Sequence, residues 1–411
     1  MPKVMIVYGT RPEAIKVAPV IAALASDDAI ELDVVVTGQH RAMLDQVNDL
    51  FGISPRVDLD VMTDRQSLAG LAATVMARLG EVVAESRPDA LLVQGDTTTA
   101  AVAGLVAYYA GVPVLHLEAG LRSGRLDSPF PEEGNRKLVG QLAALHFAPT
   151  PEARANLLRE GVAAADVVTT GNTIIDALLH ATAVAPAFDP ALQAVIDSGR
   201  RLLLVTSHRR ESWEGGIAAT ARAIGRIVEA RPDVHAVIPL HRNPIVREAF
   251  AAALGPHERV SVIDPLDYHR FSALMAASHL ILTDSGGVQE EAPSLGKPVL
   301  VTRDTTERPE GVAAGAAKLV GTDEQRIVDE VLALLDEPAA YAAMARAVNP
   351  YGDGLASGRV IAAIRAFFAS GARMEDFSPG PASRTAAQAN SSGSPIQNSS
   401  VDGSIASLST R

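Results

Sequence analysis

The sequence contains no cysteine among its 411 residues, and that absence excludes several kinds of chemistry. Without thiols the chain forms no disulfide, no thiolate zinc site and no cysteine nucleophile. A chain of this kind suits a reducing compartment. Any proton transfer that the protein performs then depends on carboxylates and histidine.

Positive charge and long apolar runs are also scarce. The 36 basic residues are outnumbered by 48 acidic ones, which gives a formal net charge of −12. That balance argues against a protein that binds nucleic acid by covering phosphates with positive charge. No stretch approaches the roughly 18 uncharged apolar residues of a membrane span, and residues 3–8 resemble a strand rather than a signal peptide. We therefore expect a cytoplasmic protein with no nucleic-acid and no membrane partner.

What the sequence does contain is a regular alternation of short, β-rich apolar runs with Ala- and Leu-rich stretches long enough for helices. Such alternation predicts parallel sheets with right-handed crossovers. Continuous apolar strands are typical of sheets that helices cover on both faces. The predicted strands are 4–8, 32–37, 90–94, 113–117, 145–148, 202–206, 234–239, 260–263, 280–283, 298–302 and 318–320.

The alternation restarts after about residue 171, which divides the chain. Because one domain usually takes roughly 100 to 200 residues, we predict two doubly wound, Rossmann-like α/β domains over residues 1–171 and 172–373. A last helix near 356–368 can pack back on the first domain. Residues 374–411 are rich in serine and lack apolar periodicity, so we expect a disordered, low-complexity tail.

Polar side chains follow the predicted strands, at the edge where open parallel sheets bind ligands. Arg11 and Lys16 follow the first strand, Asp96 the third and Glu118 the fourth. In the second half, Asp-Ser-Gly-Gly-Val-Gln-Glu-Glu at 284–291 directly follows a strand. Its glycines let backbone N–H groups approach a ligand, and a helix N-terminus favours negative charge. A diphosphate fits this turn, and one of the two glutamates at its end fits a ribose diol.

Each candidate also has an ordinary structural explanation. The 284–291 segment can be a capped turn, Asp96 can cap the helix that starts near Thr97, and Glu118 can pair with Arg122 at helical spacing. The other candidates can be solvated cations or carboxylates favoured by a helix dipole, namely Arg11, Lys16, Glu132 and Glu133. Their joint occurrence at successive strand ends favours a functional site.

Metal and nicotinamide sites are not indicated by the sequence. The ten histidines are scattered without ligand spacing. The glycine-rich segment 352–358 has the wrong third spacing for a dinucleotide fingerprint and follows no predicted strand. We therefore predict no metal and no cofactor.

Taken together, these segments resemble the non-hydrolysing UDP-N-acetylglucosamine 2-epimerase family. The resemblance rests on motifs that occur in order across both halves of the chain. They are GTRPEAIK at 9–16, QHRAMLDQ at 39–46, QGDT at 94–97, EAGLR at 118–122, PFPEE at 129–133, TSHRRE at 206–211, DSGGVQEEAPSLGKP at 284–298 and RDTTERPE at 303–310.

The resemblance implies a B-type glycosyltransferase fold with the active site in a cleft between the domains, and a homodimer. It implies reversible conversion of UDP-N-acetylglucosamine to UDP-N-acetylmannosamine for polysaccharide synthesis, without NAD or an obligatory metal. The nucleotide-sugar contacts that it implies are Arg11, Lys16, Asp96, Glu118, His208, Leu266, Phe271, Ser285, Gly286, Gly287, Glu291 and Arg308. Leu266 departs from the pattern, because some members have Gln at this position.

The reaction explains why such residues are needed. The C2 hydrogen of the sugar is not next to a carbonyl, so without a nicotinamide its removal must accompany cleavage of the anomeric C1–O bond. UDP then leaves, 2-acetamidoglucal forms, and UDP adds back with protonation from the other face. This route needs a base, an acid on the other face and cations for the diphosphate. The resemblance implies Asp96, Glu118, Glu132 and His208 as the catalytic groups, and leaves open which carboxylate acts on which face.

The resemblance also implies activation by the substrate at a second site. Candidates for that site are Gln39, Gln46, Gln66, Glu133, Arg209 and His241. Three other functions stay open at this point: a UDP-sugar-dependent glycosyltransferase of the same fold, a nucleotide-sugar-binding regulator without turnover, and a hydrolysing epimerase.

Overall fold

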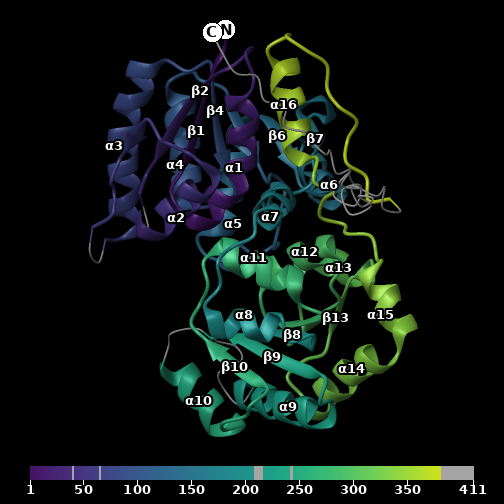
Figure 1. Cartoon of the computed structure of the whole chain (residues 1–411). Helices are drawn as coiled ribbons and strands as arrows, with labels where there is room; N and C mark the ends of the chain where they lie inside the picture. Colours follow the sequence, from purple (N-terminus) through teal and green to yellow (C-terminus); the bar gives the residue numbers. More distant parts are fainter. Residues whose placement is uncertain (39–40, 64–65, 208–215, 241–243, 381–411) are drawn as a thin grey trace, which may run out of the picture.

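The computed structural model contains two separate parallel β-sheets, each flanked by helices (Figure 1). It describes residues 1–38, 41–63, 66–207, 216–240 and 244–380. The first sheet has the strand order β3-β2-β1-β4-β5-β6-β7, and the second has the order β10-β9-β8-β11-β12-β13. Neighbouring strands are parallel throughout both sheets. The predicted α/β fold with two Rossmann-like units is confirmed, and we call the two sheets with their helices the first and the second lobe.

The predicted strands are all present, and two short strands were not foreseen. These are β3 and β7, which are two and three residues long and therefore show little of the apolar pattern of a strand. The strands are β1 Lys3–Tyr8, β2 Glu31–Val36, β3 Val57–Asp58, β4 Ala90–Gln94, β5 Val114–Leu117, β6 Ala143–Ala148, β7 Val167–Thr169, β8 Arg201–Thr206, β9 Val234–Pro239, β10 Val260–Ile263, β11 Leu280–Thr283, β12 Val299–Val301 and β13 Ala317–Leu319.

Helices connect the strands throughout the described residues. They are α1 Arg11–Ala25, α2 Arg41–Phe51, α3 Leu68–Ser86, α4 Thr98–Tyr109, α5 Glu132–Leu142, α6 Pro151–Arg159, α7 Thr173–Ala183, α8 Pro190–Ile196, α9 Gly216–Ala230, α10 Pro244–Leu254, α11 Tyr268–Ala277, α12 Gly286–Glu291, α13 Pro309–Ala313, α14 Glu324–Asp336, α15 Pro338–Ala345 and α16 Ala356–Phe367, with short 3₁₀ turns at Ala164–Asp166 and Ala292–Leu295.

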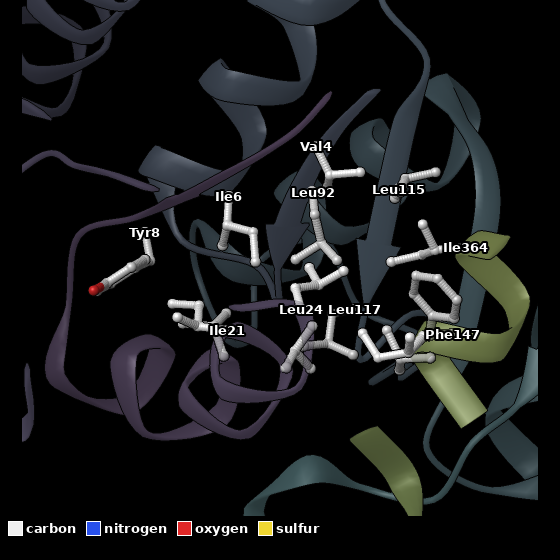
Figure 2. Packing of buried hydrophobic residues seen from close by; sticks show 14 of the residues in the cluster. Val4, Ile6, Tyr8, Ile21, Leu24, Leu92, Leu115, Leu117, Phe147 and Ile364 are labelled. Atoms are coloured by element: carbon white, nitrogen blue, oxygen red, sulfur yellow. The ribbon is translucent and has the colours of Figure 1, made fainter. Parts of the chain in front are cut away.

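Helices cover both faces of the first sheet, which explains its continuous apolar strands. Successive residues of β1 alternate between two cores: Ile6 and Tyr8 face α1, α2, α7 and α16, whereas Met5 and Val7 face α3 and α4. Figure 2 shows the first of these cores, where Phe147 of β6 lies near Ile364 of α16. The second sheet is covered in the same way, by α9, α10 and α14 on one face and by α8, α11 and α12 on the other.

In both sheets the strand order reverses next to the first strand of the unit. The reversal lies between β1 and β4 in the first lobe and between β8 and β11 in the second. In open parallel sheets the loops at such a reversal diverge and leave room for a ligand beyond the carboxyl ends of the strands. The segments that follow β1, β4 and β11 are therefore the candidate positions for binding a ligand.

The helices α7 and α16 lie where the chain passes between the lobes. In α7, Ile174 and Ile175 belong to the core of the first lobe, whereas Leu178 belongs to the core of the second. The last helix, α16, packs against α1 and α7 of the first lobe. Asp176 of α7 accepts hydrogen bonds from the first backbone N–H groups of α16, at 3.2 and 2.8 Å. The chain therefore enters the second lobe at α7 and returns to the first lobe at α16.

The start of the expected C-terminal tail needs a correction. The tail was expected from residue 374, but Phe377 is 5% exposed and its N–H donates to Thr169 O at 2.7 Å. The guanidinium of Arg359 lies 5.6 Å from the centre of the Phe377 ring. Phe377 thus packs on the folded protein, and the local pattern does not predict this because a single aromatic residue in a polar segment shows no periodicity. The described part of the chain contains no helix that combines the length and the apolar character of a membrane span.

Candidate active site

The carboxyl ends of β1, β4 and β5 bring predicted site residues together. Lys16 lies in the second turn of α1, and its ammonium donates to both carboxylate oxygens of Glu118, at 2.5 and 2.6 Å. Gln94, the last residue of β4, donates to the same carboxylate. Glu118 has a φ of +63°, in the left-handed region that costs an L-residue roughly 1–2 kcal/mol. Strain of this kind persists where surrounding contacts hold a functional residue in place.

The Lys16–Glu118 pair is charged although it is buried. Burial raises the pKa of Glu118, but the Lys16 ammonium, aided by Arg308 and Arg136, outweighs burial, and the net pKa lies below its usual value. Burial likewise lowers the pKa of Lys16, but the carboxylates of Glu118 and Glu290 reverse that effect and the net pKa is raised. Both groups therefore keep their charges near neutral pH. The alternative that Glu118 pairs with Arg122 on a helix is wrong, because this segment is not helical and Arg122 pairs with Glu160 at 2.6 Å.

A buried carboxylate ties the turn after β1 to the turn after β4. Glu13 accepts hydrogen bonds from the N–H groups of Gly9 and Thr10 at 3.0 and 2.7 Å, and from the Thr97 hydroxyl at 2.6 Å. Thr97 is the N-cap of α4 and accepts from the Ala100 N–H. The alternative that Asp96 caps this helix is therefore wrong.

Asp96 pairs with a cation that the sequence interpretation missed. Arg136 of α5 lies 2.6 Å from the Asp96 carboxylate, and Asn135 donates to the Asp96 carbonyl at 2.8 Å. Burial raises the pKa of Asp96, Arg136 opposes it, and the net pKa remains raised. The sequence held a signal for Arg136, since it follows Glu132 by four positions and so lies on the same face of α5.

The two neighbouring glutamates of α5 have different environments. Glu132 is half-buried, and its charge contributes to the raised pKa of Asp96. Glu133 is fully buried and accepts from the N–H groups of Ser123 and Gly124 at 3.0 and 3.3 Å. It also pairs with Arg136 at 3.2 Å. Both carboxylates do occupy the first turn of the helix, as the structural explanation expected.

The second lobe contributes a glycine turn and a cation. Arg308 donates through Nε to Glu290 Oε1 at 2.6 Å, and the Glu290 carboxylate raises the pKa of Arg308, so the guanidinium stays charged. Thr306 ties this loop to α12, because its hydroxyl donates to Gln289 Oε1 at 2.6 Å. Ser285 precedes α12 as its N-cap residue, but its side chain makes no capping hydrogen bond. The first N–H groups of a helix, here those of Gly286 and Gly287, have no partner within the helix.

Glu291 differs from the other carboxylates. Burial, and after it the charge of Glu290, raises the pKa of Glu291 to about 8. The Tyr268 hydroxyl lies 3.3 Å from Glu291 Oε2. Glu291 is therefore mostly protonated at pH 7, and a ligand that donates hydrogen bonds would favour its ionised form.

Asn172 connects the two groups of charges and was also missed. Its side-chain amide donates to Glu118 Oε1 at 3.2 Å and to Glu290 Oε2 at 3.0 Å. The two partners lie 54 residues before and 118 residues after it in the sequence, so no local pattern indicates the contact. Lys16, Glu118, Asn172, Glu290 and Arg308 thus form one continuous network across the lobes.

The remaining predicted residues lie in other places. Arg11 and Gln46 are exposed and line a groove with Tyr268 and Arg270, between α2 and α11. Leu266 and Phe271 are partly buried against a core of the second lobe, and Gln66 accepts from the Thr63 N–H at 3.4 Å before α3. Four predicted residues lie outside the described part of the chain, namely Gln39, His208, Arg209 and His241. Within the described part, no cluster of three or more histidine and carboxylate side chains is suited to a metal ion.

Known proteins resemble this chain in sequence and in fold. The family model described as UDP-N-acetylglucosamine 2-epimerase matches residues 22–365. The chain is 51% identical over 369 residues to UDP-N-acetylglucosamine 2-epimerase of Escherichia coli (strain K12), with 88% of this chain and 98% of the relative covered. It is 51% identical over 360 residues to the enzyme of that name from Bacillus subtilis (strain 168), with 87% and 94% covered. The crystal structure of UDP-GlcNAc 2-epimerase from Neisseria meningitidis bound to UDP-GlcNAc matches with a TM-score of 0.78 and 44% identity, covering 89% of this chain and all of that one.

Proposed function

The chain belongs to the UDP-N-acetylglucosamine 2-epimerase family, an isomerase family, and we propose that it interconverts UDP-N-acetylglucosamine and UDP-N-acetylmannosamine by inversion at C2. The single observation that carries this proposal is the pair of carboxylates Glu118 and Asp96 beside Lys16. Burial raises the pKa of both carboxyl groups. Lys16 outweighs burial at Glu118, so the net pKa of Glu118 is lowered, whereas Arg136 does not outweigh burial at Asp96, so the net pKa of Asp96 is raised. Two carboxyl groups whose pKa values are pushed apart suit opposite roles in proton transfer.

We assign the roles as follows. The ionised Glu118 takes the C2 proton while the C1–O bond breaks, so that UDP leaves with the bonding electron pair and the C1=C2 double bond of 2-acetamidoglucal forms. UDP then adds back to C1, and Asp96 in its protonated form delivers a proton to the opposite face of C2. Each turnover leaves Glu118 protonated and Asp96 ionised, and exchange with water restores both. We assign assistance in that exchange to the half-buried Glu132, whose charge acts on Asp96.

The nucleotide is proposed to lie mainly against the second lobe. Arg308 and the N–H groups of Gly286 and Gly287 are suited to the diphosphate, as cations and free backbone donors are. Ser285 is the third proposed contact in this turn, although its own N–H already donates to Thr283 Oγ1 at 2.9 Å. Glu291 is suited to the ribose diol, and Leu266 and Phe271 to the uracil. Arg11, from the groove beside Tyr268, and His208 are further proposed contacts to the diphosphate, with His208 as a proton donor to the leaving phosphate.

The decisive experiment follows UDP-N-acetylglucosamine by proton NMR in deuterated water with the purified protein. We expect UDP-N-acetylmannosamine to appear and deuterium to enter C2, because the C2 proton passes through side chains that exchange with solvent. Unchanged C2 protons after long incubation would exclude the proposal. Release of UDP only on addition of an acceptor would indicate a glycosyltransferase, and free N-acetylmannosamine would indicate a hydrolysing enzyme.

Further properties are proposed with this activity: use of the product in polysaccharide synthesis, a cytoplasmic location, substrate activation and a homodimer. The exposed Tyr108 and Tyr109 of α4 support a dimer, since Tyr109 lines an apolar groove with Met76 and Val106 between α3 and α4. Sedimentation of a variant with both tyrosines changed to glutamate tests it, and an unchanged sedimentation coefficient would place the interface elsewhere.

Substrate activation has support of a different kind. The groove of Arg11 and Gln46 offers polar side chains beside Tyr268, whose hydroxyl reaches Glu291. Glu133 would act indirectly, through Arg136 and residues 123–124, because its carboxylate is already used by them. Rate curves of a Gln46 variant test this, since loss of sigmoidality is expected.

A further inference from the structure

Asn172 lies where the chain leaves the first sheet and enters α7, and its side chain contacts a carboxylate from each lobe. Nδ2 donates to Glu118 Oε1 at 3.2 Å and to Glu290 Oε2 at 3.0 Å. The amide group has two hydrogens, so each carboxylate receives one. We propose that Asn172 is a positioning residue that orients the Glu118 carboxylate toward the substrate and fixes it relative to Glu290 of the second lobe. This inference rests on the proposed function, because it concerns how Glu118 is prepared for proton transfer.

The rest of Asn172 is held in place by its surroundings. The residue is 4% exposed, and its N–H donates to Tyr351 O at 2.6 Å. Its Oδ1 accepts from the Ile174 N–H at 3.1 Å and so caps α7. The preceding Gly171 has a φ of +81°, and a Cβ there would lie 3.4 Å from the Gly352 Cα. A side chain whose backbone and both polar ends are fixed can in turn fix the orientation of its partners.

The neutral amide suits its place between two ion pairs. On one side of it lies the Lys16–Glu118 pair, whose charged atoms are 2.5 Å apart. On the other lies the Arg308–Glu290 pair, whose charged atoms are 2.6 Å apart. Both cations are also proposed ligands of the substrate. When either cation turns toward phosphate, its carboxylate loses a donor, whereas Asn172 carries no charge for the phosphate to attract. The hydrogen bonds from Asn172 are therefore expected to persist when the substrate binds.

The test begins with Asn172→Asp, which is nearly isosteric and retains an oxygen to cap α7. It removes both N–H donors and adds a carboxylate. The charged and titratable groups around Glu118 are Lys16 of α1, Arg308 of the 303–308 loop, Arg136 of α5, Asp96 after β4, Glu290 of α12 and His116 of β5. We expect kcat to fall on the order of 10- to 100-fold, with a smaller change in KM. The acid limb of the kcat profile should move to higher pH, because the added negative charge disfavours ionised Glu118.

A double variant and a matched control separate positioning from general damage. In Asn172→Asp combined with Glu290→Gln, the introduced amide at 290 can donate to the introduced carboxylate at 172. We therefore expect Asn172→Asp to lower kcat by a smaller factor in the Glu290→Gln background than in the wild type. The control is Asn349→Asp, since Asn349 donates to the backbone carbonyl of Glu290 at 2.9 Å. Its acid limb should stay at the wild-type pH.

The inference is overturned if Asn172→Asp keeps the wild-type kcat and pH profile, or if its cost is the same in both backgrounds. If Asn172→Asp does not fold, Asn172→Ser replaces it, because serine also caps helices. A lowered kcat at an unchanged melting temperature is then expected, and an unchanged kcat contradicts the inference. The proposed function fails on a different observation, namely a wild-type protein that exchanges no deuterium into C2.

Discussion

In the first lobe, Glu118 and Asp96 are each paired with a cation, Lys16 and Arg136, whereas in the second lobe Glu291 is buried beside another carboxylate. The pKa of Glu118 falls below its usual value mainly because Lys16 outweighs burial, while burial raises the pKa of Glu291 to about 8. Glu118 is thus ionised near neutral pH, whereas Glu291 is mostly protonated and neutral. This contrast is consistent with our proposal that the first lobe carries the proton transfer and that the second lobe binds the nucleotide.

If the lobes divide the work in this way, the largest effect belongs to Glu118. We expect Glu118→Gln to lower kcat by about 10²- to 10⁴-fold, the usual contribution of a general base, with little change in KM. The control is Glu160→Gln, which also removes an ion-paired glutamate, here paired with Arg122 at 2.6 Å. Initial rates at saturating substrate measure the effect. A kcat of Glu118→Gln within about tenfold of the wild-type value would contradict the proposed division of roles between the lobes.

Lys16→Met tests the first lobe through its effect on the pH dependence of kcat. Because Lys16 holds the pKa of Glu118 down, its removal raises that pKa, and the ionised base is lost at a higher pH. We expect a loss of kcat of about 10²-fold that is greater at pH 6 than at pH 8. Lys3→Met serves as the control, since Lys3 pairs with Glu31 at 2.9 Å at the far end of β1. An equal loss at both pH values would mean that Lys16 acts on the substrate alone.

Arg308→Gln tests the second lobe. Loss of a charge-assisted contact to phosphate costs about 1.5–3 kcal/mol, so we expect KM for UDP-N-acetylglucosamine to rise roughly 10- to 100-fold. The fall in kcat should be smaller than for Glu118→Gln. Arg222→Gln is the control, because Arg222 pairs with Glu324 on the surface at 2.7 Å. A fall in kcat with unchanged KM would place Arg308 with the catalytic groups instead.

The smallest effect is expected for Glu291→Gln. Glu291 is protonated below pH 8 and ionised above it, and a carboxylate accepts from a ribose diol more strongly than a neutral acid does. The wild-type KM should therefore fall a few-fold between about pH 7 and pH 9, and this dependence should vanish in Glu291→Gln. Glu330→Gln, at a surface pair with Lys318, should keep it. A KM that is independent of pH in the wild type would contradict the assignment.

Much of the fold and part of the site could be predicted from the sequence. The strand runs and the strand-end positions of Lys16, Asp96 and Glu118 follow from local apolar patterns, since burial on both faces leaves continuous apolar runs. The short strand β7 could not be predicted because its three residues show little of the apolar pattern of a strand. The docked Phe377 could not be predicted because its partner Thr169 is distant in sequence. The role of Arg136 could have been predicted from its helical spacing from Glu132, whereas the role of Asn172 could not.

The α/β class, the two repeated units and the segments that follow the strands can be predicted from the sequence alone, because they depend on local periodicity and on which residues are absent. Which charged side chains meet depends on how the chain folds. Lys16 pairs with Glu118, 102 residues away, and Asn172 joins Glu118 to Glu290, which lies 118 residues after Asn172. The charge of a buried group depends on its neighbours in space and on its loss of water, and neither can be read from local sequence.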